Sequence, residues 1–135
     1  MWLAVYLFWL FLLGVAFSAF RWGGRDERCV ATAYVAATIA TLLLRLPGQY
    51  ASLNIGVATV DVGLLVVLLC LVTRTARWWL VLSAALQLVT VLGHVAMFDG
   101  GTRAFDYFMT VVSSSYPAVL LLAYATLRHV FRRDA

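Results

Sequence analysis

The chain has 135 residues, of which 64% are hydrophobic and 12% are charged, and its mean hydropathy is +0.96. Soluble proteins are about half apolar and a quarter charged, and a chain this short buries only about two-thirds of its surface on folding. A water-soluble fold would therefore expose large apolar patches, so we expect an integral membrane protein. The net charge is +4, but the basic residues are scattered over short loops, which argues against nucleic acid as a partner.

Five apolar segments are long enough, or nearly so, to cross roughly 30 Å of hydrocarbon as helices. They are residues 2–20, 29–46, 52–73, 78–98 and 106–128, and the connections between them are short. We therefore predict an all-α fold, a single domain over residues 1–135 built as a bundle of five transmembrane helices. No basic residue precedes the first apolar run, so this run is interpreted as a retained anchor and not as a cleaved signal peptide.

The arginines predict the orientation, because basic residues concentrate in short cytoplasmic loops. Five spans leave only Arg45 and Arg103 on the outer side. If residues 29–46 did not cross, the basic residues would divide evenly between the two sides of the membrane. The cytoplasmic set, expected to lie among lipid headgroups, comprises Arg21, Arg25, Arg28, Arg74, Arg77, Arg128, Arg132 and Arg133. The N-terminus is therefore expected outside and the C-terminus in the cytoplasm. All ten basic residues are arginine, a habit of GC-rich bacterial genomes, so we expect a bacterial inner-membrane protein.

Polar residues recur at helical spacing within the expected spans, so they form stripes on single helix faces. Polar side chains are costly in lipid, and the stripes should therefore face one another or water. The expected intramembrane polar site consists of Asp61, His94, Gln87, Thr90, Arg45, Asn54, Thr41, Ser114 and Thr110. Most of these residues fall in the outer half of the membrane, which predicts a polar pocket open to the outer side.

Asp61 falls near the middle of the membrane, where a lone charge costs about 3 kcal/mol. It needs a proton or a partner. The candidate partners are His94, about 9 Å nearer the outer face by helical rise alone, and Arg45, if its side chain turns inward. Two interpretations stay open. Either Asp61 holds the helices together with Gln87 and Ser114, or it takes up and releases a proton together with His94.

No motif of a known catalytic site occurs, since GxSxG, HExxH, P-loop and GxGxxG patterns are all missing. Cys29 and Cys70 lack the CxxC or histidine spacing of a zinc site. We therefore expect neither an enzyme nor a metal or cofactor, whereas a bound lipid or small apolar ligand is compatible with the polar pocket. Pro117, which follows three serines, is interpreted as a static helix kink and not as a gating hinge.

Two functions of different classes fit this pattern. The favoured one is a small non-catalytic accessory, assembly or ligand-binding subunit, whose partners are membrane lipids and either other membrane-protein subunits or copies of itself. The alternative is a proton-coupled transporter or channel, acting as a homodimer, that uses Asp61 and His94. An odd number of spans lacks the inverted halves of many transporters, which favours the first function.

Overall fold

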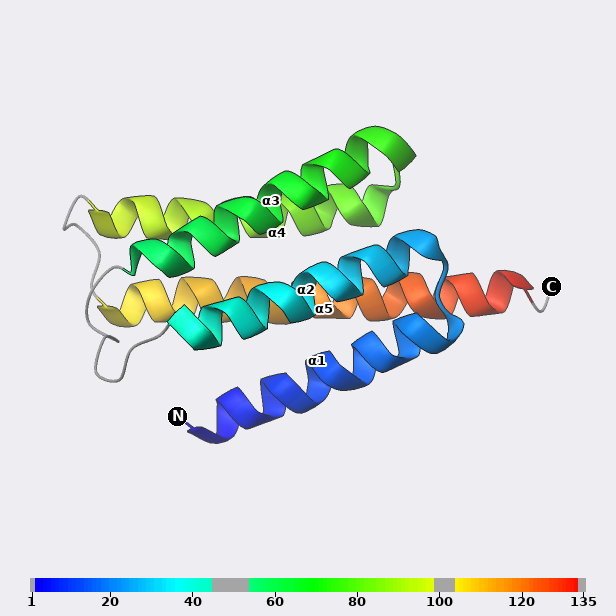
Figure 1. Ribbon diagram of the computed structural model, residues 1–135, viewed down its shortest axis with the longest axis horizontal. Coiled ribbons are helices and arrows are strands. Elements are labelled where there is room, and N and C mark those ends of the chain that lie inside the picture. Colours follow the sequence, from blue (N-terminus) through cyan, green and yellow to red (C-terminus); the bar gives the residue numbers. More distant parts are fainter. Residues whose placement is uncertain (1, 45–53, 99–103, 134–135) are drawn as a thin grey trace.

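The structure, a computed structural model, describes residues 2–44, 54–98 and 104–133, and within these residues it contains helices and no strand. Figure 1 shows the helices in chain order. They are α1 (Trp2–Trp22), α2 (Arg25–Leu44), α3 (Ile55–Thr75), α4 (Trp78–Phe98) and α5 (Ala104–Arg133). The predicted all-helical fold is therefore confirmed for the described residues.

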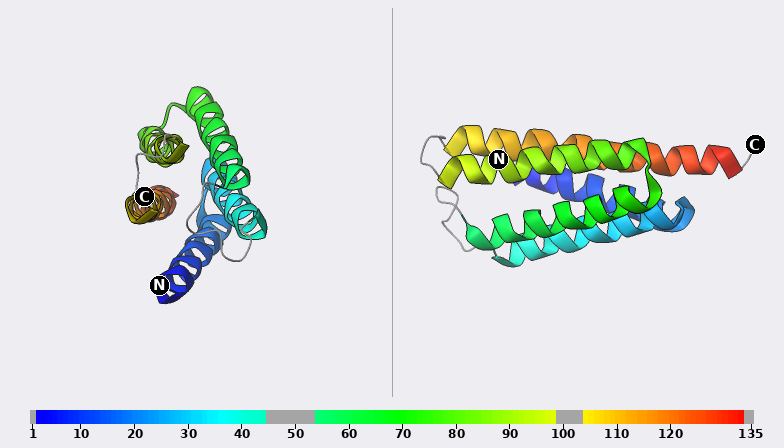
Figure 2. Two further views of the ribbon diagram at one scale, coloured as in Figure 1. Left: turned by 90° about the vertical axis from the view of Figure 1, so that its left-hand side faces the viewer. Right: turned by 90° about the horizontal axis from the view of Figure 1, so that it is seen from above.

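Successive helices run in opposite directions, so the chain reverses at alternate ends of an elongated bundle (Figure 1). Each helix contacts its neighbour in the chain, and α1 also contacts α5, so that the helices close into a ring. Further contacts join α2 and α5 across the ring (Figure 2). The helix ends that carry the arginines predicted to be cytoplasmic all lie at one end of the bundle, which we call the arginine-rich end.

Two short connections at the arginine-rich end have clear local causes. Between α1 and α2, a Cβ atom at Gly23 would approach the Ala19 carbonyl oxygen to 2.4 Å, so this close turn requires glycine. Between α3 and α4, Ala76 adopts a left-handed conformation (φ 46°) and its N–H donates to Val72 O at 2.9 Å, which ends α3. The two turns place the beginnings of α2 and α4 beside each other.

Small and aliphatic residues fill the centre of the bundle. Ala19 of α1, Ala31 of α2 and Ala84 of α4 are buried, as are Leu68 of α3 and Leu122 of α5. Small side chains let helix backbones approach closely, which is how helices associate in lipid. Large apolar side chains cover the outside instead, on all five helices. An apolar exterior around a bundle is the arrangement that a lipid environment stabilises.

Three helices, α2, α3 and α4, are long and apolar enough to cross a membrane by length and composition. In α1 the apolar segment that was found, Tyr6–Trp22, is shorter. The structure thus fits a membrane protein, while spanning by α1 and α5 stays a prediction. Three helices are longer than predicted: α1 ends at Trp22 instead of residue 20, α2 begins at Arg25 instead of residue 29, and α5 continues to Arg133 instead of residue 128. Acidic residues in the first turn of α2 favour its earlier start.

Candidate functional site

One face of α4 carries four polar residues at helical spacing, Ser83, Gln87, Thr90 and His94, and the structure buries all four. Helix α4 packs between α3 and α5, so this polar face lies inside the bundle. The Ser83 hydroxyl donates to a carbonyl of its own helix, Trp79 O, at 2.9 Å. The other three side chains bond to residues of α3 or α5.

Asp61 of α3 is held by two of these side chains. His94 Nε2 lies 2.7 Å from Asp61 Oδ2, and Gln87 Nε2 donates to Asp61 Oδ1 at 3.1 Å. The same Gln87 nitrogen lies 3.1 Å from the backbone oxygen of Asp61. Both carboxylate oxygens therefore have partners on α4, and we call Asp61, Gln87 and His94 the Asp61 centre.

The contact between Asp61 and His94 contains a proton. A carboxylate only accepts hydrogen bonds, so a 2.7 Å contact requires a proton either on His94 Nε2 or on Asp61 Oδ2. The His94 side chain is 4% exposed and that of Asp61 is 16% exposed, so the contact is largely shielded. Within the described residues no group of three histidine, cysteine or acidic side chains could hold a metal ion.

The sequence overestimated the height difference between Asp61 and His94. Asp61 lies 15 residues before Ala76, at the turn between α3 and α4, and His94 lies 18 residues after it. In an antiparallel pair of helices this difference of three residues corresponds to about 4.5 Å of helical rise, which the two side chains span to meet directly. Arg45, the other candidate partner of Asp61, lies outside the described residues.

A second contact joins the polar face of α4 to α5. The hydroxyl oxygens of Thr90 and Ser114 are 2.7 Å apart, and both residues are buried. The Thr90 hydroxyl also lies 3.3 Å from Leu86 O of its own helix. Helix α4 is therefore joined to α3 through Asp61 and to α5 through Ser114, on one continuous face.

The remaining members of the predicted polar site lie elsewhere in the bundle or outside the described residues. Asn54 is the N-cap of α3, because its Oδ1 accepts hydrogen bonds from Gly56 N and Val57 N, at 3.0 and 3.3 Å. Its Nδ2 also donates to Leu44 O at 2.8 Å, which joins the end of α2 to the start of α3. This capping role was not predicted. Thr41 is partly buried in α2, and the side chain of Thr110 in α5 lies outside the described residues.

Pro117 lies inside α5, and the helix continues on both sides of it. Ser113 to Ser115, which precede it, all take part in interactions. The static kink stays a prediction.

The arginine-rich end holds an ion pair that the sequence interpretation missed. Arg77 Nη1 donates to Glu27 Oε1 at 2.9 Å, and Arg77 Nε lies 3.1 Å from Asp26 Oδ2. Glu27 is 1% exposed, whereas the Arg77 side chain is almost half exposed. The available signal was a pair of acidic residues within an otherwise basic set of loops. Arg77 was assigned to topology alone, although it also binds the start of α2.

Comparisons with known protein families, curated proteins and solved structures find no match to this chain.

Proposed function

We propose that this protein is a small non-catalytic membrane protein, an accessory or ligand-binding subunit in which the Asp61 centre clamps α3 to α4. The observation that carries the proposal is the engagement of both Asp61 carboxylate oxygens by α4. Apolar burial does not drive helices together in lipid, so interhelical hydrogen bonds and close contact hold such a bundle. A carboxylate whose oxygens are both engaged by a neighbouring helix is suited to this role.

Membrane insertion is supported by three apolar helices and by an exterior of large apolar side chains. The gathering of arginines at one end supports an orientation with that end in the cytoplasm and the N-terminus outside. A bacterial inner membrane is the location that these features and the all-arginine composition favour. The outer-side polar pocket remains part of the proposal, with membrane lipids among the ligands.

Two glycines that face outward support the association of this chain with partner subunits or with a second copy of itself. A Cβ atom at Gly14 of α1 or at Gly63 of α3 would meet nothing within 4 Å. These small-residue positions therefore make no close contact inside the described bundle. They leave room for a helix from another chain, which is how small residues serve helix association in lipid.

The experiment is native mass spectrometry of the gently extracted protein, with co-purifying chains and lipids identified. Asp61→Ala and His94→Ala should lower the yield of intact complex and the stability of the chain. The matched control is Thr59→Ala, because Thr59 is exposed on the same helix and its hydroxyl donates only within α3, to Ile55 O at 2.8 Å. Unchanged yield and stability in both Asp61 and His94 variants would contradict the proposal.

The second candidate is proton-coupled transport, which the proton between Asp61 and His94 favours. In this function Asp61, whose side chain is 16% exposed, would exchange a proton while its partner His94 stays buried. Asp61→Asn separates the two functions, because asparagine replaces the hydrogen bonds but cannot carry the proton. Flux measured in proteoliposomes should then disappear with expression intact. Flux that persists in Asp61→Asn refutes transport through this pair. If the wild-type protein shows no flux, transport is refuted and the accessory function is the proposal that stands.

A further inference from the structure

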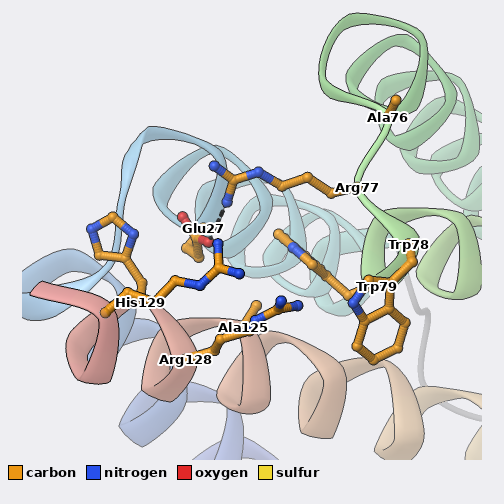
Figure 3. A pocket seen from close by; sticks show the side chains of 9 residues that line it. Glu27, Ala76, Arg77, Trp78, Trp79, Ala125, Arg128 and His129 are labelled. Carbon is orange, nitrogen blue, oxygen red and sulfur yellow. Dashed lines mark hydrogen bonds and ion pairs between the residues drawn. The ribbon is translucent and has the colours of Figure 1, made fainter. Parts of the chain in front are cut away.

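A cavity of about 360 Å³ opens at the arginine-rich end of the bundle (Figure 3). Its volume lies in the range of about 300–1,000 Å³ that is typical of ligand sites. Residues from α2, α4, α5 and the turn between α3 and α4 line it. The lining includes Glu27, Arg77, Trp79, Arg128, His129 and Arg132, none of which belongs to the Asp61 centre.

Glu27 brings an unpartnered acceptor to this cavity. Its Oε1 accepts a hydrogen bond from Arg77, but Oε2 is buried and has no hydrogen-bond partner among the described residues. A Cβ atom at Gly24 would come within 2.8 Å of Glu27 Oε2 and 2.9 Å of His129 Cε1. Glycine at this position therefore lets the carboxylate and the imidazole lie close to the backbone of residue 24. Because a buried acceptor without a donor is unfavourable, the carboxylate is poised to accept a hydrogen bond from a ligand.

The rim of the cavity is basic and one wall is aromatic. Arg128 and Arg132 are one helical turn apart on α5, so they face the cavity from one side, and both are exposed. Guanidinium groups bind phosphate through charge-assisted hydrogen bonds. Trp79 is buried in the wall, and the neighbouring Trp78 stacks at a tilt on Tyr124 with 5.4 Å between ring centroids. Tryptophan is typical of the level of lipid headgroups in membrane proteins.

We propose that this cavity binds the headgroup of a phospholipid that carries a primary amine, such as phosphatidylethanolamine. The lipid phosphate lies against Arg128 and Arg132, and its ammonium group donates a hydrogen bond to Glu27 Oε2. A headgroup with no amine would leave Glu27 Oε2 without a donor, although Oε1 keeps its hydrogen bond from Arg77. A quaternary ammonium headgroup has no N–H to donate. The inference rests on the membrane location in the proposed function, which puts this end of the bundle at the cytoplasmic headgroup level.

The test measures lipid retention by the full chain in native mass spectrometry after exchange into vesicle lipids. Phosphatidylethanolamine should be retained about tenfold more than phosphatidylcholine or phosphatidylglycerol, as one charge-assisted hydrogen bond implies. Glu27→Gln should remove the preference for phosphatidylethanolamine over phosphatidylcholine. Arg128→Gln combined with Arg132→Gln should lower retention of all three lipids. Arg74→Gln is the matched control, because Arg74 is exposed at the same end and does not line the cavity.

Equal retention of phosphatidylethanolamine and phosphatidylcholine by the wild-type protein overturns the inference, as does a preference for phosphatidylglycerol. Soluble phosphoethanolamine that competes as well as the lipid overturns the assignment to a lipid. If Glu27→Gln does not fold, the lipid selectivity of the wild-type protein and the lipid retention of the double arginine variant still test the inference. A chain that sediments outside the membrane fraction refutes the proposed function as well, whereas a membrane-embedded chain without lipid preference refutes this inference alone.

Discussion

Replacement of Asp61 by alanine is the sharpest test of how this bundle is held together. The substitution removes two side-chain contacts between α3 and α4, those of Asp61 Oδ1 with Gln87 and Oδ2 with His94. It leaves the contact between Gln87 Nε2 and the backbone oxygen of residue 61 in place. It also removes the Asp61 carboxylate from beside the ring of His94, which is buried.

The magnitude follows from these two lost contacts. Interhelical hydrogen bonds in membrane proteins contribute about 0.6 kcal/mol on average and about 1.7 kcal/mol at most. Asp61→Ala should therefore lower the free energy of unfolding by about 1–3 kcal/mol. The His94 contact is short at 2.7 Å, which favours the upper part of this range.

Asp61→Asn should lose less than Asp61→Ala. The asparagine side-chain oxygen can still accept from Gln87 Nε2, and its amide nitrogen can donate to a neutral His94. The assay is reversible unfolding of the purified protein in mixed micelles, with Thr59→Ala as the control for a side chain that bonds only within α3. If Asp61→Ala is as stable as this control, the Asp61 centre does not hold α3 to α4 and the reasoning fails.

Two further substitutions probe the arginine-rich end. Arg77→Ala leaves Glu27 buried without its cation, and since Arg77 is itself half exposed, the loss of stability should be below the roughly 3–5 kcal/mol of a fully buried pair. A denaturation midpoint equal to that of the wild type would show that Glu27 finds another partner. Gly23→Ala should destabilise the chain, because its Cβ would lie 2.4 Å from Ala19 O. Gly14→Ala meets nothing within 4 Å and should not destabilise the isolated chain in a melting experiment.

Helices were predictable from this sequence because long apolar runs broken by glycine, proline and arginine leave little alternative in lipid. The polar face of α4 was predictable for a related reason. Ser83, Gln87, Thr90 and His94 recur at helical spacing, and the structure buries all four against α3 and α5. Periodicity along one helix indicates which residues share a face without any knowledge of the neighbours.

Contacts between helices were harder to predict, because they depend on the relative heights of helices. Asp61 and His94 were placed too far apart by helical rise, because counting residues from the turn at Ala76 leaves a difference of three residues, about 4.5 Å, which their side chains span. Glu27 and Arg77 are far apart in sequence and meet only because two turns lie side by side at one end of the bundle. A count of basic residues predicts the orientation of the chain but does not indicate which arginine pairs with which acidic residue.

The polar contacts are distributed unevenly over the bundle, and this has a consequence for α1. The turn into α4 is joined to α2 by Arg77, and α4 itself is joined to α3 by Asp61 and to α5 by Thr90. Within Tyr6–Trp22 of α1, the side-chain hydrogen bond that occurs is local, from Ser18 to Gly14 O at 2.9 Å.

Helix α1 is therefore held mainly by shape, through residues such as Leu12 and Ala16 that are buried against its neighbours. Because apolar burial does not drive association in lipid, a helix without polar contacts to its neighbours opens more readily than one that has them. Backbone amides of residues 6–22 should accordingly exchange hydrogen faster than those of α4 in detergent, and a bound partner chain on the Gly14 face should slow them. Exchange in α1 as slow as in α4 for the isolated chain would show that shape alone holds this helix as firmly as the Asp61 centre holds α3.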